Sequence, residues 1–283
     1  MNPACAGARS LDVLRWRAGQ AQQVDDWLTE EVPVALQYNG VSHAVMLATP
    51  LDLEDFATGF SLGEGIIEQA GQLYDCEAEH GPLGITLHLE VATRCLEVLR
   101  QRRRTLAGRT GCGLCGTDSL EQVLRPLREL PAHARSSVGS DAVARALRAL
   151  RTQQRLNAAT GAVHAAGWCD DDGRLLLLRE DVGRHNALDK LIGAMARAGN
   201  DASHGFVVVT SRASVEMVQK AAQAGVPLLV AVSAPTALAV QTARSVGMGL
   251  AGLARGDDLV VYSGAQRIRL ELPSTTSTSL IPT

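Results

Sequence analysis

From residue 26 to about residue 100, apolar and polar positions alternate in short segments that predict strands. Residues 32–36 and 44–48 are apolar segments on either side of Asn39-Gly40, a pair that favours a tight hairpin turn. Residues 85–91 are apolar at every second position, which is the period of a half-buried strand. Between these segments, three apolar residues follow at helical spacing, namely Leu53, Phe56 and Phe60. An α+β unit is therefore expected in this part of the chain.

The second half of the chain repeats a pattern of strands and helices. Ser140 is the expected N-cap of a helix that reaches about Leu156, and a hairpin follows around a turn that ends at Gly173. Residues 206–210 and 228–232 are uninterrupted apolar runs, which are typical of parallel strands buried on both faces. Helical segments separate these runs, so the pattern predicts a three-layer α/β/α domain.

These patterns divide the chain into four parts. Residues 1–25 carry little pattern and are expected to be disordered, as is the polar tail of residues 273–283. Residues 26–130 form the predicted N-terminal α+β domain, which ends in a glycine-rich loop and a short helix. Residues 131–272 form the predicted α/β/α domain. Prolines in the connection mark the boundary between the two domains.

Composition and charge argue against several classes of protein. The chain has 27 lysine and arginine residues against 30 aspartate and glutamate residues, a net charge of −3, so no nucleic-acid partner is expected. No apolar run approaches the roughly 18 residues of a membrane span, and the N-terminus lacks the pattern of a secretion signal. The expected compartment is the cytoplasm, with no membrane partner. There the six cysteines stay as thiols and form no disulfide framework.

The glycine-rich loop is the strongest chemical signal in the sequence. Residues 111–116 read Gly-Cys-Gly-Leu-Cys-Gly, so glycines flank Cys112 and Cys115 and leave both sulfurs uncrowded. Five arginines precede the loop, and a nearby cation lowers a cysteine pKa from about 8.5, which favours the thiolate that attacks or carries sulfur. The alternative is half of a zinc site. His164 and His185 could complete it, but neither belongs to a ligand-spaced pair.

Polar residues also follow two strands of the predicted sheet. Arg184 and His185 come after one strand and open a helix, and Ser211 and Arg212 come after the next strand. The carboxyl ends of parallel strands and the N-termini of the helices that follow them commonly bind anions. The alternative is that a nearby aspartate or asparagine only caps the helix while the arginine and histidine are solvated. Two such sites at one edge of a sheet favour an anion pocket.

A turn between the last two strands is the third candidate. It consists of Leu253, Ala254, Arg255, Gly256, Asp257 and Asp258. A hairpin loop alone explains this composition. In the alternative, binding interpretation, the glycine lets a ligand approach the backbone while arginine and aspartate contact a guanine or a phosphate. The residues alone do not decide between the two.

Several segments together resemble the FdhD-type accessory sulfurtransferases of formate dehydrogenase. The resembling motifs are residues 108–116, 180–190 and 211–220, with further matches at 32–40 and 59–67. The resemblance runs from about Glu31 to Arg267 and implies homodimers and a second domain similar in fold to cytidine deaminases. The zinc pattern of those deaminases, His-x-Glu followed by Pro-Cys-x-x-Cys, is absent from the sequence. Deaminase activity is therefore disfavoured, and no protein-bound zinc is expected.

The resemblance implies that this protein transfers sulfur. A cysteine desulfurase would load Cys112 with a persulfide, and the sulfur would pass to the molybdenum bis(molybdopterin guanine dinucleotide) cofactor that formate dehydrogenase receives. The implied cofactor contacts fall on residues 253–258, and the anion pocket would hold the cofactor's phosphates, so GDP is an expected analogue. The choice of Cys112 over Cys115 rests on the resemblance, because a helix N-terminus could instead activate Cys115. A cofactor chaperone that never carries sulfur covalently and a zinc-stabilised module are the alternatives.

Overall fold

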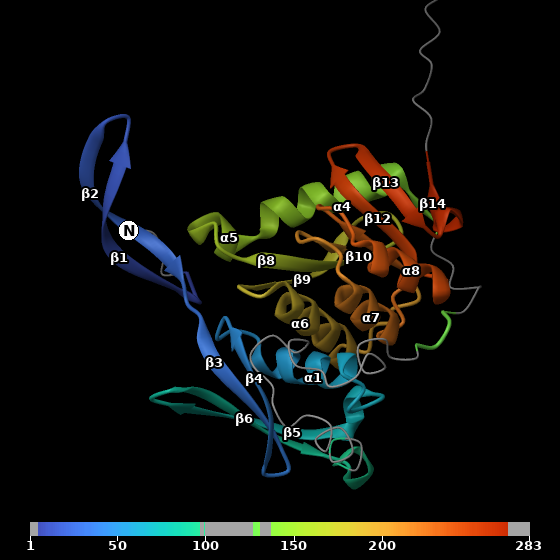
Figure 1. Cartoon of the computed structure of the whole chain (residues 1–283), viewed down its shortest axis with the longest axis horizontal. Coiled ribbons are helices and arrows are strands. Elements are labelled where there is room, and N and C mark those ends of the chain that lie inside the picture. The colour runs from blue at the N-terminus through green and yellow to red at the C-terminus, as the bar shows by residue number, and fades with distance from the viewer. Residues whose placement is uncertain (1–4, 97–98, 100–126, 131–136, 271–283) are drawn as a thin grey trace, which may run out of the picture.

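The structure is a computed structural model that describes residues 5–96, 99, 127–130 and 137–270 of the 283-residue chain. It contains a four-stranded sheet, a six-stranded sheet and a two-stranded arm, with helices beside both sheets (Figure 1). The mixed α/β class expected from the sequence is therefore confirmed. The loop with Cys112 and Cys115 and the tail of residues 273–283 lie outside the described residues. The domain boundary near residue 130 stays a prediction.

The four-stranded sheet has the order β4-β3-β6-β5 and packs against one helix. Its elements are β3 (Val32–Tyr38), β4 (Val41–Ala48), α1 (Leu53–Gly63), the 3-10 turn η1 (Ala70–Gln72), β5 (Leu73–Gly81) and β6 (Gly84–Val91). Asn39 and Gly40 have φ angles of 44° and 79° between β3 and β4, which confirms the predicted hairpin. Alternate residues such as Val34 and Leu87 are fully buried in the core with α1.

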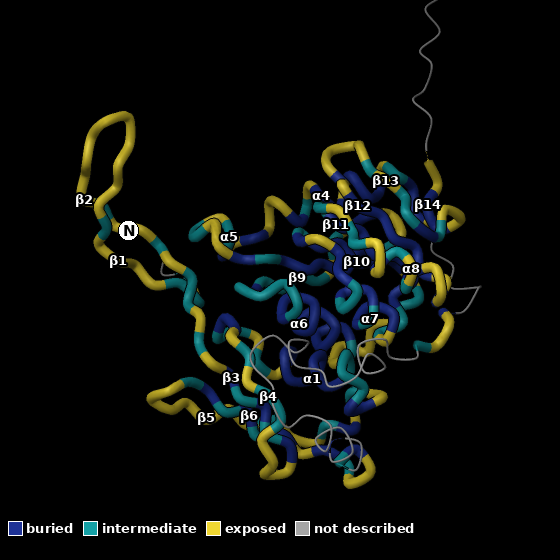
Figure 2. The backbone as a smooth tube through the Cα atoms, in the orientation of Figure 1, coloured by how far each residue is buried: buried dark blue, intermediate teal, exposed yellow. Residues whose placement is uncertain are grey.

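Residues 8–29 form an antiparallel arm of two strands, β1 (Ala8–Arg17) and β2 (Gln20–Thr29). The arm extends away from both sheets, and most of it is exposed (Figures 1 and 2). The expectation that residues 1–25 are disordered is therefore wrong for residues 8–25. A ribbon with solvent on both faces leaves no clear alternation of apolar and polar residues. The arm meets the body at its base, where the hydroxyl oxygens of Thr29 and Thr160 lie 3.3 Å apart.

The six-stranded sheet has the order β13-β12-β11-β10-β8-β9. Its strands are β8 (His164–Cys169), β9 (Leu175–Asp181), β10 (Phe206–Val209), β11 (Leu228–Ala231), β12 (Gly249–Arg255) and β13 (Asp258–Ser263). A short parallel pair, β7 (Val138–Gly139) and β14 (Ile268–Arg269), and the 3-10 turn η2 (Ala265–Arg267) complete this part. Strands β10, β11 and β12 are parallel, and β9 runs the same way because β8 is antiparallel to both β9 and β10. The carboxyl ends of β9 to β12 therefore share one edge.

Helices pack on both faces of the six-stranded sheet. On one face lie α6 (Arg184–Arg197), α7 (Val215–Gln223) and α8 (Ala237–Ser245), and on the other lies α4 (Ser140–Gln153), which α5 (Arg155–Thr160) follows. Val207 and Val209 belong to the first core, and Phe206 and Val208 belong to the core with α4. All of β10 is thus buried, as its apolar run predicts.

The ends of α4 differ from the prediction. Gly139 is the N-cap and Ser140 is the first helical residue, because β7 pairs with β14 up to Gly139 and the helix starts directly after it. The helix ends at Gln153, since Gln154 leaves the helical backbone with a ψ of 86°. Leu156 therefore lies in α5.

Helices α1 and α6 join the two sheets by crossing with their backbones in contact (Figure 1). A Cβ atom on Gly59 would lie 1.7 Å from the carbonyl oxygen of Asp189. A Cβ atom on Gly193 would lie 1.9 Å from the carbonyl oxygen of Asp55. Because glycine has no Cβ atom, these two positions allow the close approach.

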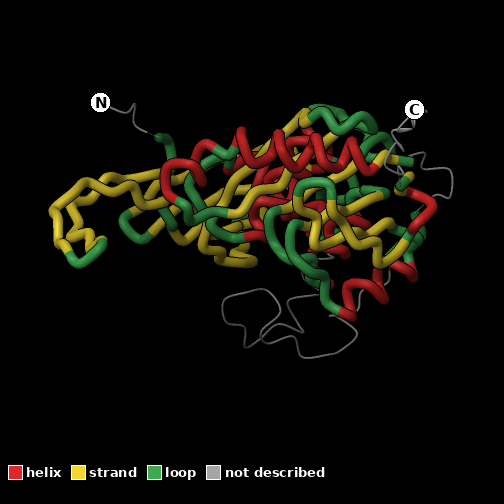
Figure 3. Tube along the Cα trace, turned by 90° about the horizontal axis from the view of Figure 1, so that it is seen from above, coloured by secondary structure: helices red, strands yellow, loops and turns green. Residues whose placement is uncertain are grey.

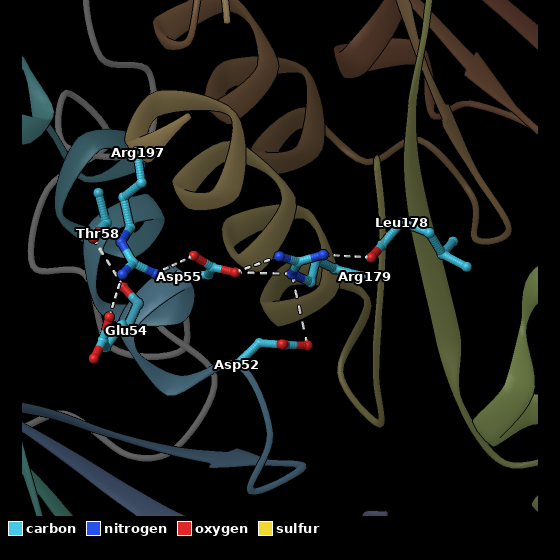
Figure 4. Close-up of polar contacts among 7 residues, drawn as sticks. All are labelled: Asp52, Glu54, Asp55, Thr58, Leu178, Arg179 and Arg197. Atoms are coloured by element: carbon cyan, nitrogen blue, oxygen red, sulfur yellow. Dashed lines mark hydrogen bonds and ion pairs between the residues drawn. The ribbon is translucent and has the colours of Figure 1, made fainter. Parts of the chain in front are cut away.

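Charged side chains surround this crossing (Figure 4). Asp55, which is 6% exposed, accepts from Arg179 Nη2 at 2.7 Å and from Arg197 Nη1 at 2.6 Å. Glu54 also pairs with Arg197, and Asp52 lies 3.6 Å from Arg179. The hydrogen bond to Asp55 raises the pKa of Arg197, so this link between α1 and α6 stays charged. The small sheet and the large sheet are therefore held together by a glycine contact and by ion pairs.

Candidate functional site at the carboxyl edge of the larger sheet

A buried ion pair lies beneath the carboxyl end of β9. Lys190 Nζ lies 2.7 Å from Asp181 Oδ2, and both side chains are completely buried. Lys190 also donates to the carbonyl oxygen of Thr49 at 2.9 Å, while the Thr49 amide donates to Asp181 Oδ2 at 3.0 Å. The other oxygen of Asp181 accepts from the Gly183 amide at 2.7 Å and from Asn186 Nδ2 at 2.9 Å. Asp181 is therefore more than a helix cap, because it fixes the start of α6 against the small sheet.

A second ion pair lies between α1, α6 and α7. Lys220 Nζ donates to Asp189 at 2.8 Å and lies 3.5 Å from Glu64. Burial raises the pKa of Asp189 to about 6, although the charge of Lys220 opposes this shift. Lys220 is thus the group that favours the ionised form of Asp189 against the effect of burial. The aspartate and lysine residues of motifs 180–190 and 211–220 act here as structural contacts.

His185 and Glu216 form a contact at the N-termini of two neighbouring helices. His185 Nε2 in the first turn of α6 lies 2.5 Å from Glu216 Oε2 in the first turn of α7, and each side chain is 21% exposed. Burial raises the pKa of Glu216, but the hydrogen bond and charge of His185 outweigh it, so the net shift is downward. A partly exposed histidine is thereby held at the edge of the sheet.

Arg184 and His164 lie beside this contact. Burial lowers the pKa of His164, the charges of Arg184 and His185 lower it further, and the charge of Asp181 opposes the shift. Arg184 Nε is buried and has no hydrogen-bond partner within the described part of the chain. A guanidinium with an unused donor next to a histidine is suited to an anionic ligand.

Backbone hydrogen bonds join the loops after β10 and β11 to each other and to the end of β12. The Ser233 amide donates to the Ser211 carbonyl at 3.4 Å, and the Leu253 amide donates to the Ser233 carbonyl at 3.2 Å. The Ser211 side chain is buried and donates to the carbonyl of Arg212 at 3.0 Å, whereas Arg212 is exposed. The predicted pocket residues after β9 and β10 thus lie at one edge, separated only by β8.

Residues 253–258, predicted as a turn, comprise the end of β12, a two-residue turn at Gly256 and Asp257, and the first residue of β13. Leu253 is 43% exposed at a φ of 52°, and Ala254 is buried. Asp257 lies 3.6 Å from Arg148 of α4, so the tip leans toward the α4 face of the sheet. Four strand spacings, roughly 19 Å, separate β12 from β9. The turn therefore shares the carboxyl edge with Arg184 and His185 but lies at its other end.

Residues 29–269 match the model of the FdhD/NarQ family. The chain belongs to this family. A relative from Variovorax paradoxus named sulfur carrier protein FdhD is 56% identical over 92% of this chain and 93% of its own length. A protein of the same name from Cupriavidus necator is 53% identical over 96% of each chain. A crystal structure from Desulfotalea psychrophila, described as a formate dehydrogenase accessory protein, has a TM-score of 0.72 at 23% identity over 93% of this chain and 99% of that chain, a likeness of fold.

Burial restricts the chemistry of three of the four cysteines that the structure describes, and the fourth, Cys5, is partly exposed. Burial raises the pKa of Cys169 to about 12 and that of Cys76 to about 11, so both are protonated thiols at neutral pH. Cys95 is also buried. Cys112 and Cys115 lie outside the described residues. Within the described residues, no group of three or more His, Cys, Asp or Glu side chains is placed to hold a metal ion.

Sequence reasoning did not find every residue of this site. Glu216 contacts His185 from 31 positions away, and Thr49 reaches Asp181 from the loop after β4. Glu216 lies in the first turn of the helix that follows β10, and His185 lies in the first turn of the helix that follows β9. This equivalent position was the one sequence signal available for Glu216. Nothing in the sequence pointed to Thr49.

None of the described helices is long and apolar enough to span a membrane.

Proposed function

We propose that this protein accepts sulfur from a cysteine desulfurase as a persulfide on Cys112 and transfers it to the molybdenum cofactor of formate dehydrogenase. The observation that carries the proposal is that relatives 53% and 56% identical to this chain are named sulfur carrier proteins. The glycine-flanked Cys112 and Cys115 are the thiols that suit this role, since burial keeps Cys76 and Cys169 protonated.

The sulfur transfer is an exchange between two sulfur atoms. The Cys112 thiolate attacks the outer sulfur of the desulfurase persulfide, a new S–S bond forms on Cys112, and the desulfurase cysteine leaves as a thiolate. If Cys115 then attacks the inner sulfur, hydrosulfide is released and a Cys112–Cys115 disulfide forms. Oxidation of the two cysteines to the disulfide supplies the two electrons that reduce the released sulfur to hydrosulfide, so no further reductant is needed in that turnover.

The cofactor's guanosine phosphates are assigned to the carboxyl edge of the larger sheet. Arg184, His185, Ser211 and Arg212 supply donors and positive charge near β9 and β10. Residues 253–258 lie at the other end, so an extended ligand such as bis(molybdopterin guanine dinucleotide) is better suited to both ends than a single nucleotide. GDP is the analogue expected to bind.

Mass spectrometry after incubation with a cysteine desulfurase and cysteine tests sulfur transfer. The wild-type chain should gain the mass of one sulfur atom that a reducing agent removes, Cys112→Ser should gain none, and Cys115→Ser should retain measurable loading. Cys169→Ser is the control and should load like wild type. Loading of the Cys112→Ser protein would refute the assignment. A cofactor chaperone would bind the cofactor with both cysteines replaced and would never gain sulfur.

Calorimetry with GDP tests the cofactor site. Arg212→Ala should bind GDP more weakly than wild type, because it loses a charged donor at the pocket, while Arg174→Ala on the distant surface is the control. Equal binding by all three proteins would remove Arg212 from the pocket.

We also propose that the protein acts in the cytoplasm and forms a homodimer. The α/β/α part is proposed to be similar in fold to cytidine deaminases. Helices on both faces of the mixed sheet support the last of these. Comparison of strand order and direction with deaminase coordinates tests it.

A further inference from the structure

The carboxylate of Glu216 lies where the N-termini of two helices meet. Helices α6 and α7 lie side by side in the body of the molecule, from which the arm of β1 and β2 projects (Figures 1 and 3). Neither helix has a side-chain hydrogen bond from its N-cap residue. The positive ends of both helices therefore favour a negative charge at this place. Glu216, in the first turn of α7, supplies that charge from within the chain.

Two side chains contact this carboxylate, and a third acts on it through its charge. Glu216 Oε2 lies 2.5 Å from His185 Nε2 and accepts from the hydroxyl of Ser214 at 3.4 Å. Burial raises the pKa of Glu216, but His185 and the charge of Arg184 together lower it. His185 Nε2 is buried with Glu216 against it. A ligand therefore reaches this nitrogen only when Glu216 moves away.

Arg184 keeps bonding capacity for a ligand beside this contact. Its Nε is buried and has no hydrogen-bond partner among the residues that the structure describes. The aspartates before and within α6, Asp181 and Asp189, do not neutralise it, because each pairs with a buried lysine. Glu216 is therefore the carboxylate at this place that can exchange with the acidic groups of a ligand.

We propose that Glu216 is a specificity-determining residue that excludes singly charged anions from this pocket and is displaced by a diphosphate. Exchange of the carboxylate for another singly charged anion gains no charge interaction with Arg184. A diphosphate carries more than one negative charge and more acceptor oxygens, so it can contact Arg184 and His185 together. The Glu216 side chain is 21% exposed, which leaves it a path into water when the ligand binds. This role rests on the proposed binding of guanosine phosphates at this edge.

Calorimetry with GDP tests the displacement. Glu216→Gln should bind GDP about tenfold more tightly than wild type, because the amide keeps the shape of the side chain but does not compete as an anion. Glu79→Gln is the matched control, since it removes one negative charge from a histidine–glutamate pair on the small sheet, and it should bind GDP like wild type. Adding Arg184→Gln to Glu216→Gln should abolish the gain, which locates it at this pocket.

A carboxylate added from solution tests the exclusion of singly charged anions. In Glu216→Ala, acetate should raise the Kd for GDP at least about twofold more than chloride does at equal ionic strength, because acetate can take the vacated place. In wild type, acetate and chloride should have equal effects. There the tethered carboxylate of Glu216 already fills the place at a high effective concentration.

The outcomes separate this role from the proposed cofactor site. Equal or weaker GDP binding by Glu216→Gln than by wild type would overturn the proposal and leave the GDP site standing. The proposal also fails if the gain persists with Arg184→Gln, or if acetate acts no more strongly on Glu216→Ala than on wild type. Absence of GDP binding by all of these proteins would overturn the cofactor site and this role together. Circular dichroism checks that each variant is folded.

Discussion

Replacing Lys190 by methionine removes one charge of the buried ion pair while keeping most of the side-chain volume. Lys190 and Asp181 are both completely buried, with 2.7 Å between Nζ and Oδ2, so water cannot replace the lost partner. Leaving a buried charge without its counter-ion costs about 3–5 kcal/mol. Three donors still reach Asp181 in the variant, from Thr49, Gly183 and Asn186, and they offset part of the cost. We expect a loss of about 3 kcal/mol in the free energy of unfolding.

Urea denaturation followed by circular dichroism measures this loss, which at an m-value of about 3 kcal/mol/M lowers the midpoint by about 1 M. The matched control is Arg145→Gln, which breaks an exposed pair with Asp141 and should cost no more than about 0.5 kcal/mol. Adding Asp181→Asn to Lys190→Met should recover part of the stability, because the unpaired charge is then gone. If Lys190→Met lowers the free energy of unfolding no more than Arg145→Gln does, the buried pair does not stabilise the contact between α6 and the small sheet, and the reasoning is wrong.

Gly59→Ala should destabilise the protein by about 3 kcal/mol in the same urea assay, because the added carbon would overlap the Asp189 carbonyl, whereas Gly71→Ala has open space and should be nearly neutral. In the folded protein, the rate of Cys76 alkylation by iodoacetamide should rise tenfold per pH unit up to about pH 11, because burial raises the pKa at which the reactive thiolate forms. A rate that levels off near pH 9.0, the ordinary pKa of a cysteine, would contradict the effect of burial. His185→Gln should weaken GDP binding about tenfold in calorimetry through loss of the imidazole hydrogen bond to the ligand. Arg174→Gln is the control and should leave GDP affinity unchanged. If the His185→Gln protein binds GDP as tightly as wild type, His185 lies outside the pocket.

The parts of the fold that could be predicted are those with a buried face. The hairpin at Asn39-Gly40 and the apolar run of β10 were visible because burial imposes a pattern on the sequence. Strand β5 and the arm were missed because most of their residues face solvent. A strand without a buried face differs little in composition from a loop, and only its hydrogen bonds to a neighbour reveal it.

The candidate site was predictable in place but not in detail. Strand direction was enough to bring Arg184 and Ser211 to one edge, since parallel strands end on the same side. The sequence did not indicate that Asp181 would turn inward to a lysine nine residues later, because burial of a charge depends on the loop at Thr49 that covers it. The pairing of His185 with Glu216 likewise depends on how two helices lie side by side.

The glycine crossing of α1 and α6 has a consequence for evolution and protein engineering. At Gly59 and Gly193 each backbone fits against the other helix, so a larger residue on either side is not compensated by a smaller one opposite, since both are already the smallest. Each half of the chain therefore needs its own glycine, whichever relative supplies the other half. A chimera that joins the first half of one relative to the second half of another should fold when the first half carries Gly59 and the second half carries Gly193, and it should fail when either half lacks its glycine.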